Sequence, residues 1–234
     1  MNTFPRAEHA PELLDEQHHD PLELAHSLGQ VAAVNRWLGG ARSLLVHLAP
    51  LLRADRTTHI LDVGTGSADL PRRIVDHARA RDRSVRITAT DVHPQMRELA
   101  ASACHAYPEI TVGAADALSL PYDHDSFDVA TLSLTLHHFD GEQQLRVLRE
   151  LARVSRGTVI VNDLERNRLN YAGARLMALT LWRGNRLTRH DGPLSVRRAF
   201  TPAELYRLGT DAGMHGEVHR HFFQRLVFVG ARNE

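Results

Sequence analysis

The chain has 234 residues, of which 43% are hydrophobic, so it is long and apolar enough for one domain with a sizeable core. Its 28 basic residues, all of them arginine, balance 28 acidic ones; this disfavours nonspecific binding to nucleic acid, and the lack of lysine excludes Schiff-base chemistry. The single cysteine excludes an internal disulfide. The sequence shows neither a signal peptide nor an apolar run long enough to span a membrane, so we expect a cytoplasmic protein.

The N-terminal part of the sequence is expected to form a tail and a helical cover. Residues 1–19 are polar and predict a flexible tail. Asp20 and Pro21 are typical of the cap and the first position of a helix. The apolar residues that follow recur at intervals of three and four, as on one face of an amphipathic helix. Residues 20–50 are therefore predicted to cover one end of a sheet or an active site.

From residue 58 the sequence alternates between short apolar or β-branched segments and amphipathic segments. Strands are expected at residues 58–63, 85–91, 110–112, 127–134 and 158–161, separated by helices at 68–80, after Pro94 and after a capping Asp140. Because parallel strands need helical crossovers, this alternation predicts an α/β fold with a mostly parallel, doubly wound sheet.

The last segment of the sequence departs from this alternation. Thr201 and Glu204 form the pattern of a capping box, and the helix that they start is expected to end at Gly213. Two strand-like segments follow in succession and are expected to complete a seven-stranded sheet with an antiparallel C-terminal strand. Residues 20–234 are therefore predicted to form a single domain.

A Gly-x-Gly turn follows the first predicted strand, in the segment ILDVGTGSAD. In an open α/β sheet this turn lies at the carboxyl ends of the strands, where ligands bind, and glycine lets the backbone approach a ligand closely. A dinucleotide-binding turn would have a third glycine where Asp69 stands. A carboxylate at this point is unfavourable for a pyrophosphate, but it suits a ligand that carries a cationic amine and a sulfonium.

Three acidic residues stand at the ends of successive predicted strands or in the turns that follow them, namely Asp62, Asp91 and Asp116. Asp91 can accept hydrogen bonds from both hydroxyls of a ribose. Asp116 can accept one from the amino group of adenine. The three positions therefore indicate a nucleoside ligand at this edge of the sheet.

In their order along the chain, ILDVGTGSAD, TATDVHPQM and GAADALSLPYDHDSFDVATLSLTLHHF resemble the successive motifs of class I S-adenosylmethionine-dependent methyltransferases. The chain is similar to the ubiquinone/menaquinone C-methyltransferases and related small-molecule O-methyltransferases. The resemblance covers residues 58–163 and implies a cofactor-binding core there, with S-adenosylmethionine as the cofactor and S-adenosylhomocysteine as the product. It assigns cofactor binding to Asp62, Gly64, Thr65, Gly66, Asp91, Val92, Met96, Asp116, Ala117 and Ser133.

The histidine pair in LTLHHF is the best candidate for catalysis. Methyl transfer requires mainly that the acceptor be held in line with the leaving sulfur, but a phenol must also lose its proton. Histidine is a suitable base near neutral pH, and His138 is favoured over His137. Asp163 follows the next strand and can orient a histidine. No group of residues has a convincing metal-ligand spacing, so no metal site is predicted.

Residues 165–200 are expected to cover the acceptor side of the site. An apolar helix predicted at 170–182 can form a hydrophobic wall, and the polar stretch around His190 is predicted as a solvated loop. In relatives of this layout such a wall implies a small hydrophobic acceptor: a phenol, a quinol or a polyketide-derived ring. The acceptor's identity, O- or C-methylation, and a monomeric or homodimeric state all stay open.

Two other functions compete with methyl transfer. One is a non-catalytic protein that binds a metabolite or a partner on the same fold, which the intact set of motifs disfavours. The other is an NAD-binding oxidoreductase, which Asp69 in place of the third glycine disfavours.

Overall fold

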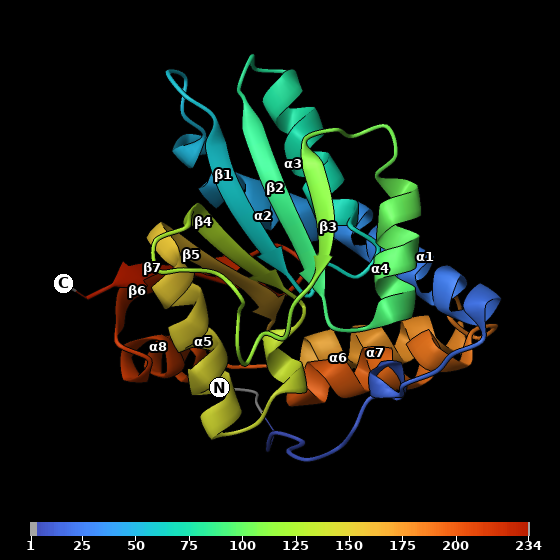
Figure 1. Ribbon diagram of the computed structural model, residues 1–234. Coiled ribbons are helices and arrows are strands. Elements are labelled where there is room, and N and C mark those ends of the chain that lie inside the picture. Colours follow the sequence, from blue (N-terminus) through green and yellow to red (C-terminus); the bar gives the residue numbers. More distant parts are fainter. Residues whose placement is uncertain (1–3, 234) are drawn as a thin grey trace.

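The computed structural model describes residues 4–233, which form a seven-stranded sheet flanked by helices (Figure 1). The strands are β1 (Thr58–Val63), β2 (Val85–Asp91), β3 (Ile110–Ala114), β4 (Phe127–Ser133), β5 (Ser155–Leu164), β6 (Met214–His221) and β7 (Arg225–Arg232). The α-helices are α1 (Pro21–Trp37), α2 (Gly40–Leu48), α3 (Asp69–Arg79), α4 (Pro94–Ala103), α5 (Glu142–Val154), α6 (Arg168–Leu179), α7 (Arg186–Arg198) and α8 (Pro202–Asp211). Short 3₁₀ turns are η1 (Leu13–Asp15), η2 (Ala49–Leu51) and η3 (Leu136–His138).

The sheet has the strand order β3-β2-β1-β4-β5-β7-β6. Strands β1 to β5 pair in parallel, and β7 pairs antiparallel with both β5 and β6. The predicted fold class, a doubly wound and mostly parallel seven-stranded sheet with an antiparallel C-terminal strand, is confirmed. The order reverses direction beside β1, so the turns after β1 and β4 lie on either side of a crevice.

Both faces of the sheet are covered, because neighbouring residues of a buried strand point to opposite faces. On β1, Ile60 belongs to the hydrophobic cluster that includes α2, α3 and α4. The next residue, Leu61, belongs to the cluster that includes α5 and α8. The strands are therefore apolar on both sides, and polar side chains can only gather at their ends.

Helices α6 and α7 lie side by side across the carboxyl ends of the strands, the end toward which the arrowheads of β1, β2 and β3 point in Figure 1. The prediction of a solvated loop around His190 is wrong, because residues Arg186–Arg198 form α7. Asn185 caps this helix by accepting a hydrogen bond from the Thr188 amide, and Asp191 is buried. The polar residues of α7 had the appearance of a loop, but Thr188, Asp191 and Arg198 are buried, while His190 is exposed.

The helix predicted to start at Pro94 does so, and two of the three predicted N-cap residues cap their helices. The Asp20 side chain accepts from the amides of Leu22 and Glu23, and Thr201 forms the expected capping box with Glu204. Asp140 does not cap α5, whose N-cap is Gly141. Its carboxylate instead pairs with Arg6 from the N-terminal segment, which explains the difference.

The N-terminal segment (residues 4–19) packs against α7 and η3. The Ala7 amide donates to the Arg197 carbonyl, and the amides of Leu13 and Leu14 donate to the Asp191 carboxylate. The sequence alone predicted a flexible tail here. In the structure this segment carries Glu12, which is 3% exposed, into the interior.

Among residues 4–233, no helix has the length and apolar character needed to cross a membrane.

Candidate functional site

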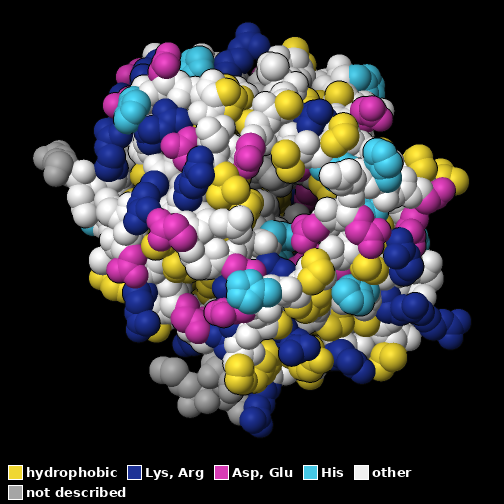
Figure 2. All heavy atoms as spheres, turned by 60° about the horizontal axis from the view of Figure 1, so that its bottom comes forward, with side chains coloured by type: hydrophobic (Ala, Val, Ile, Leu, Met, Phe, Trp, Pro, Cys, Tyr) yellow, Lys and Arg dark blue, Asp and Glu magenta, His cyan; other side chains and the backbone are white. Residues whose placement is uncertain are grey.

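A cavity of about 1110 Å³ lies at the carboxyl ends of the strands, beneath α1, α6 and α7. The face that carries α6 and α7 is hollowed near its centre, and acidic and histidine side chains gather around the hollow (Figure 2). All twelve residues predicted for the site line this one cavity. The sequence motifs are therefore brought together in space, although they lie up to 76 positions apart, from Asp62 to His138.

The glycine turn is held by Asp91. Its carboxylate accepts hydrogen bonds from the Gly66 amide and from the His93 amide, both at 2.9 Å. Gly64 and Gly66 both have a positive φ, +66° and +55°, which favours glycine. Asp91 therefore fixes the turn, and it also lines the cavity.

Asp62 lies at the end of β1 and is 2% exposed. Burial raises the pKa of Asp62 to about 6, although a 2.7 Å hydrogen bond from the Thr131 hydroxyl to Oδ1 partly offsets the effect. Its carboxylate is therefore costly to ionise in the protein alone. A cationic group beside it would relieve this cost.

We expect the pH dependence of stability to reveal this cost. Because the pKa of Asp62 is higher in the folded than in the unfolded protein, its contribution is lost as the pH rises from about 4 through about 6. Asp62→Asn should therefore gain stability relative to the wild type by about 1 to 2 kcal/mol between pH 5 and pH 7.5. Urea unfolding of the two ligand-free proteins at both pH values measures this difference. A difference that does not change with pH would contradict the assignment.

The remaining predicted cofactor residues line the same cavity as Asp62 and Asp91. Asp116 is exposed and accepts a hydrogen bond from the Leu118 amide at 2.8 Å, while Ala117 is buried beside it. Val92, with 68% of its surface exposed, and Met96 line the cavity across from them. The Ser133 hydroxyl is buried and has no hydrogen-bond partner among residues 4–233. These positions suit a ligand with an adenine-sized planar group and further polar atoms.

The opposite end of the cavity is apolar. Helix α1 contributes Val31 and Val34, and α6 with the turn after it contributes Ala174, Met177 and Trp182. Aromatic residues of the β6–β7 turn also reach this end. The prediction that residues 165–200 supply a hydrophobic wall thus agrees with the cavity lining, although no acceptor role follows from the lining alone.

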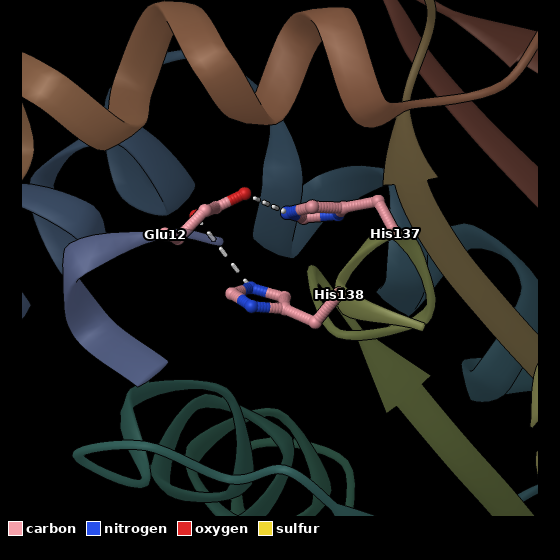
Figure 3. A group of neighbouring side chains, drawn as sticks. All are labelled: Glu12, His137 and His138. Carbon is pink, nitrogen blue, oxygen red and sulfur yellow. Dashed lines mark ion pairs between the residues drawn. The ribbon is translucent and has the colours of Figure 1, made fainter. Parts of the chain in front are cut away.

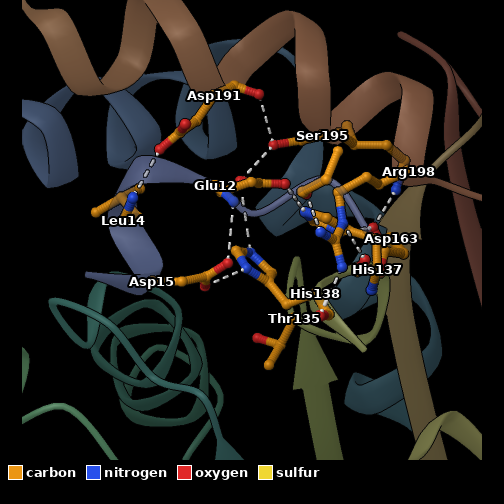
Figure 4. A network of polar contacts seen from close by, with 12 residues as sticks. Glu12, Leu14, Asp15, Thr135, His137, His138, Asp163, Asp191, Ser195 and Arg198 are labelled. Atoms are coloured by element: carbon orange, nitrogen blue, oxygen red, sulfur yellow. Dashed lines mark hydrogen bonds and ion pairs between the residues drawn. The ribbon is translucent and has the colours of Figure 1, made fainter. Parts of the chain in front are cut away.

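A network of polar contacts joins the N-terminal segment, η3, α7 and the end of β5 beside the cavity (Figure 4). His137 Nδ1 lies 2.7 Å from Asp163 Oδ1, and both side chains are almost completely buried. Arg198 of α7 donates to the carbonyls of His137 and His138 at 2.8 and 2.7 Å. The sequence-based suggestion that Asp163 orients a histidine agrees with this contact, and the histidine is His137.

His138 is held by a different carboxylate. Its Nδ1 lies 2.8 Å from Asp15 Oδ1, and its side chain is 22% exposed. Burial lowers the pKa of His138, but the nearby carboxylates of Glu12 and Asp15 outweigh this effect and raise it to about 9. In this arrangement His138 keeps a proton near neutral pH, which disfavours the base role predicted for it.

Several residues of the site have no signal in the sequence. Glu12 and Asp15 belong to a polar segment that carries no motif. Arg225 is 1% exposed at the start of β7 and contacts Asn35, whose amide contacts Asp69 of the glycine turn at 3.2 Å. Burial lowers the pKa of Arg225 to about 10. Such residues become recognisable only when the fold brings their segments together.

Comparison with known proteins also points to a methyltransferase. Residues 60–158 match the family model described as "Methyltransferase domain". The ubiquinone/menaquinone biosynthesis C-methyltransferase UbiE of Rickettsia massiliae is 29% identical over 100 residues, which are 42% of this chain and 40% of that protein. The match thus spans less than half of the curated relative.

Solved structures share the fold over most of the chain. A SAM-dependent methyltransferase from Aquifex aeolicus superposes with a TM-score of 0.66 at 16% identity, covering 91% of this chain and 98% of the other. A putative O-methyltransferase from Nostoc punctiforme superposes with a TM-score of 0.67 at 18% identity, covering 97% and 64%. At these identities the likeness concerns the fold.

The domain match, the strand order and the ordered motifs around one cavity agree with one another. Over residues 60–158 the chain matches a methyltransferase domain, and it shares its fold with S-adenosylmethionine-dependent methyltransferases of known structure.

Proposed function

We propose that this protein transfers a methyl group from S-adenosylmethionine to a small hydrophobic acceptor, a phenol, a quinol or a polyketide-derived ring. One observation carries the proposal: the residues of the cofactor motifs, the apolar side chains and the two histidines all line one continuous cavity. At about 1110 Å³ the cavity is larger than a typical site for one small molecule, so it has room for a cofactor and an acceptor together.

At the cofactor end, each predicted residue has a role that its chemistry supports. Asp91 would accept from the ribose hydroxyls, and Asp116 from the adenine amino group. Asp62 would offset the cofactor's ammonium group, which suits a buried carboxylate. The open space beside Gly66, where the nearest atom to an added Cβ is Leu28 Cδ2 at 3.7 Å, leaves room for a ligand against the backbone. Thr65 and the unpartnered Ser133 hydroxyl would make the remaining polar contacts.

At the acceptor end, the protein would act mainly by holding the acceptor in position. The sulfonium of the cofactor supplies an electrophilic methyl group. The apolar side chains of α1, α6 and the turn after α6 would hold the ring of the acceptor and exclude water. His137 and His138 would lie beside its oxygen, where they can bind a phenolate. Either O- or C-methylation can start from that anion.

Calorimetric titration with S-adenosylhomocysteine, and with NAD in parallel, tests the cofactor end. We expect binding in the micromolar range for S-adenosylhomocysteine and none for NAD. Transfer of a labelled methyl group to a panel of phenols, quinols and polyketide-derived rings then tests the acceptor end. Binding of NAD alone, or tight cofactor binding with no labelled product from any acceptor class, would contradict the proposal.

A further inference from the structure

Two histidine rings converge on one buried carboxylate at the polar boundary of the cavity (Figure 3). His137 Nε2 lies 3.5 Å from Glu12 Oε1, and His138 Nε2 lies 3.8 Å from Glu12 Oε2. One ligand-type atom from each of the three residues lies within 4.8 Å of the others. The three side chains come from two distant segments, the N-terminal segment and η3, so the fold and not sequence proximity creates the group.

Each histidine is oriented from behind by a second carboxylate. Asp163 holds Nδ1 of His137 at 2.7 Å, and Asp15 holds Nδ1 of His138 at 2.8 Å. When a carboxylate accepts from Nδ1–H, the lone pair of the neutral ring lies on Nε2. In the neutral ring, which is the form that binds a metal, each Nε2 lone pair therefore faces Glu12, and an ion would displace the second proton that His138 otherwise carries. Histidines that ligate a metal almost always have a partner of this kind on the other ring nitrogen.

Within the described part of the chain, one oxygen of the buried Glu12 carboxylate lacks a hydrogen-bond partner. It is 3% exposed, and Oε2 accepts a 2.9 Å hydrogen bond from the Ser195 hydroxyl. Oε1 has no hydrogen-bond partner among residues 4–233. An unpaired buried carboxylate oxygen is costly, and a cation would offset that cost.

The nearby arginines do not neutralise this carboxylate. Arg198 points its guanidinium at the carbonyls of His137 and His138, and it lies 3.6 Å from Asp140. Arg6 pairs with the same Asp140 at 3.3 Å. Three carboxylates, those of Glu12, Asp15 and Asp163, thus surround two imidazoles, and the arginine charge is directed elsewhere.

We propose that Glu12, His137 and His138 bind a divalent transition-metal ion such as Zn²⁺. Two imidazoles and one carboxylate are a ligand set that catalytic zinc sites use with a further position left open. Ligand atoms around a tetrahedral zinc ion are about 3.3 to 3.4 Å apart, and the three atoms here lie within 4.8 Å of one another, so the group would contract by at most about 1.5 Å. All three residues line the cavity, which leaves an open coordination position toward the acceptor end.

The proposed ion gives the site a chemical role that rests on the proposed methyl transfer. At its open position it takes the oxygen of a phenolic or quinol acceptor and acts as a Lewis acid. The acceptor's proton passes to solvent, and the resulting phenolate then forms a bond to the methyl carbon as the carbon–sulfur bond breaks. The ion holds the acceptor and lowers the pKa of its hydroxyl.

The competing explanation is a network of carboxylates and protonated imidazoles without an ion. A second histidine cluster must also be separated from the proposed site. His47 Nε2 lies 2.8 Å from His221 Nε2, and the rings of His47 and His219 are 4.5 Å apart. This cluster lies on α2 and β6 and provides a matched control.

The test uses untagged, full-length protein that has been treated with a chelator and dialysed. Calorimetry with Zn²⁺ should give one ion per chain, and Co²⁺ should give the visible absorption of a four- or five-coordinate site. Glu12→Gln and His138→Gln should each weaken Zn²⁺ binding at least about 10-fold, and the positioning variant Asp15→Asn about 10-fold. His47→Gln should bind as the wild type does.

Cofactor binding separates this proposal from the previous one. All four variants should bind S-adenosylhomocysteine with the wild-type dissociation constant, which also shows that they are folded. Absence of one-to-one Zn²⁺ binding in the wild type, or loss of binding in His47→Gln but not in Glu12→Gln, would overturn the metal site and leave the methyl-transfer proposal standing. If the wild type does not bind S-adenosylhomocysteine, that result would contradict the proposed function instead.

Discussion

Asp91→Ala is expected to raise the dissociation constant for S-adenosylhomocysteine by about 10- to 100-fold. The carboxylate is 6% exposed at the end of β2 and lines the cavity. Charge-assisted hydrogen bonds of the kind proposed to the ribose contribute about 1.5 to 3 kcal/mol, and each 1.4 kcal/mol changes the constant about tenfold. Alanine also releases the amides of Gly66 and His93, which should loosen the glycine turn. Calorimetric titration measures the constant.

Two further variants make this prediction specific. Asp211→Ala removes an exposed carboxylate at the end of α8, outside the cavity, and should leave the constant unchanged. Asp91→Asn keeps one acceptor oxygen and should have an intermediate constant. If Asp91→Ala unfolds at the wild-type temperature and still binds with the wild-type constant, Asp91 does not hold the ribose.

Gly64→Ala is expected to destabilise the ligand-free protein by about 2 to 5 kcal/mol. The backbone has a φ of +66°, which costs a residue with a Cβ about 1 to 2 kcal/mol. The added Cβ would also lie 2.4 Å from Thr135 Oγ1 and 2.7 Å from Thr135 Cγ2, and overpacking of this kind costs about 1 to 3 kcal/mol. Urea unfolding at neutral pH measures the loss.

Gly66→Ala is the matched control for this variant. Its φ is +55°, but the nearest atom to the added Cβ is Leu28 Cδ2 at 3.7 Å, so only the backbone cost of about 1 to 2 kcal/mol remains. Adding Thr135→Gly to Gly64→Ala should recover the part of the loss that comes from the contact. Equal losses in the two alanine variants would show that the contact with Thr135 does not constrain the turn.

The fold was largely predictable because its elements are locally encoded. The predicted range 85–91 is that of β2, and Thr201 and Glu204 mark the start of α8 as expected. Residues Arg186–Arg198 show that the local sequence does not determine every element. Their polar side chains resemble a loop, yet Asp191 is 2% exposed because it accepts the amides of Leu13 and Leu14 from a distant segment.

The residues of the site also form two groups: those that the sequence pattern identifies and those that only the fold brings together. Gly64, Gly66 and Asp91 stand at fixed spacings after strands, so their shared edge could be predicted from the sequence. Glu12 could not, because nothing around it forms a periodic pattern and its burial depends on contacts with η3 and Ser195. The histidine pair lines the cavity, but the carboxylates of Glu12 and Asp15 that contact it could not be predicted from the sequence.

In the proposed function, cofactor binding and acceptor binding fall to different parts of the chain. Residues 60–158, which match the methyltransferase family, include every residue proposed for the cofactor. The acceptor end takes most of its walls from residues before and after that range, including the N-terminal segment, α6 and α7. Apart from residues of α1 such as Asn35, which contacts Asp69, those flanking parts can diverge without disturbing the cofactor motifs. Relatives that keep the central domain can therefore differ in acceptor, and the flanks are the parts to exchange between relatives when the choice of substrate is to be changed.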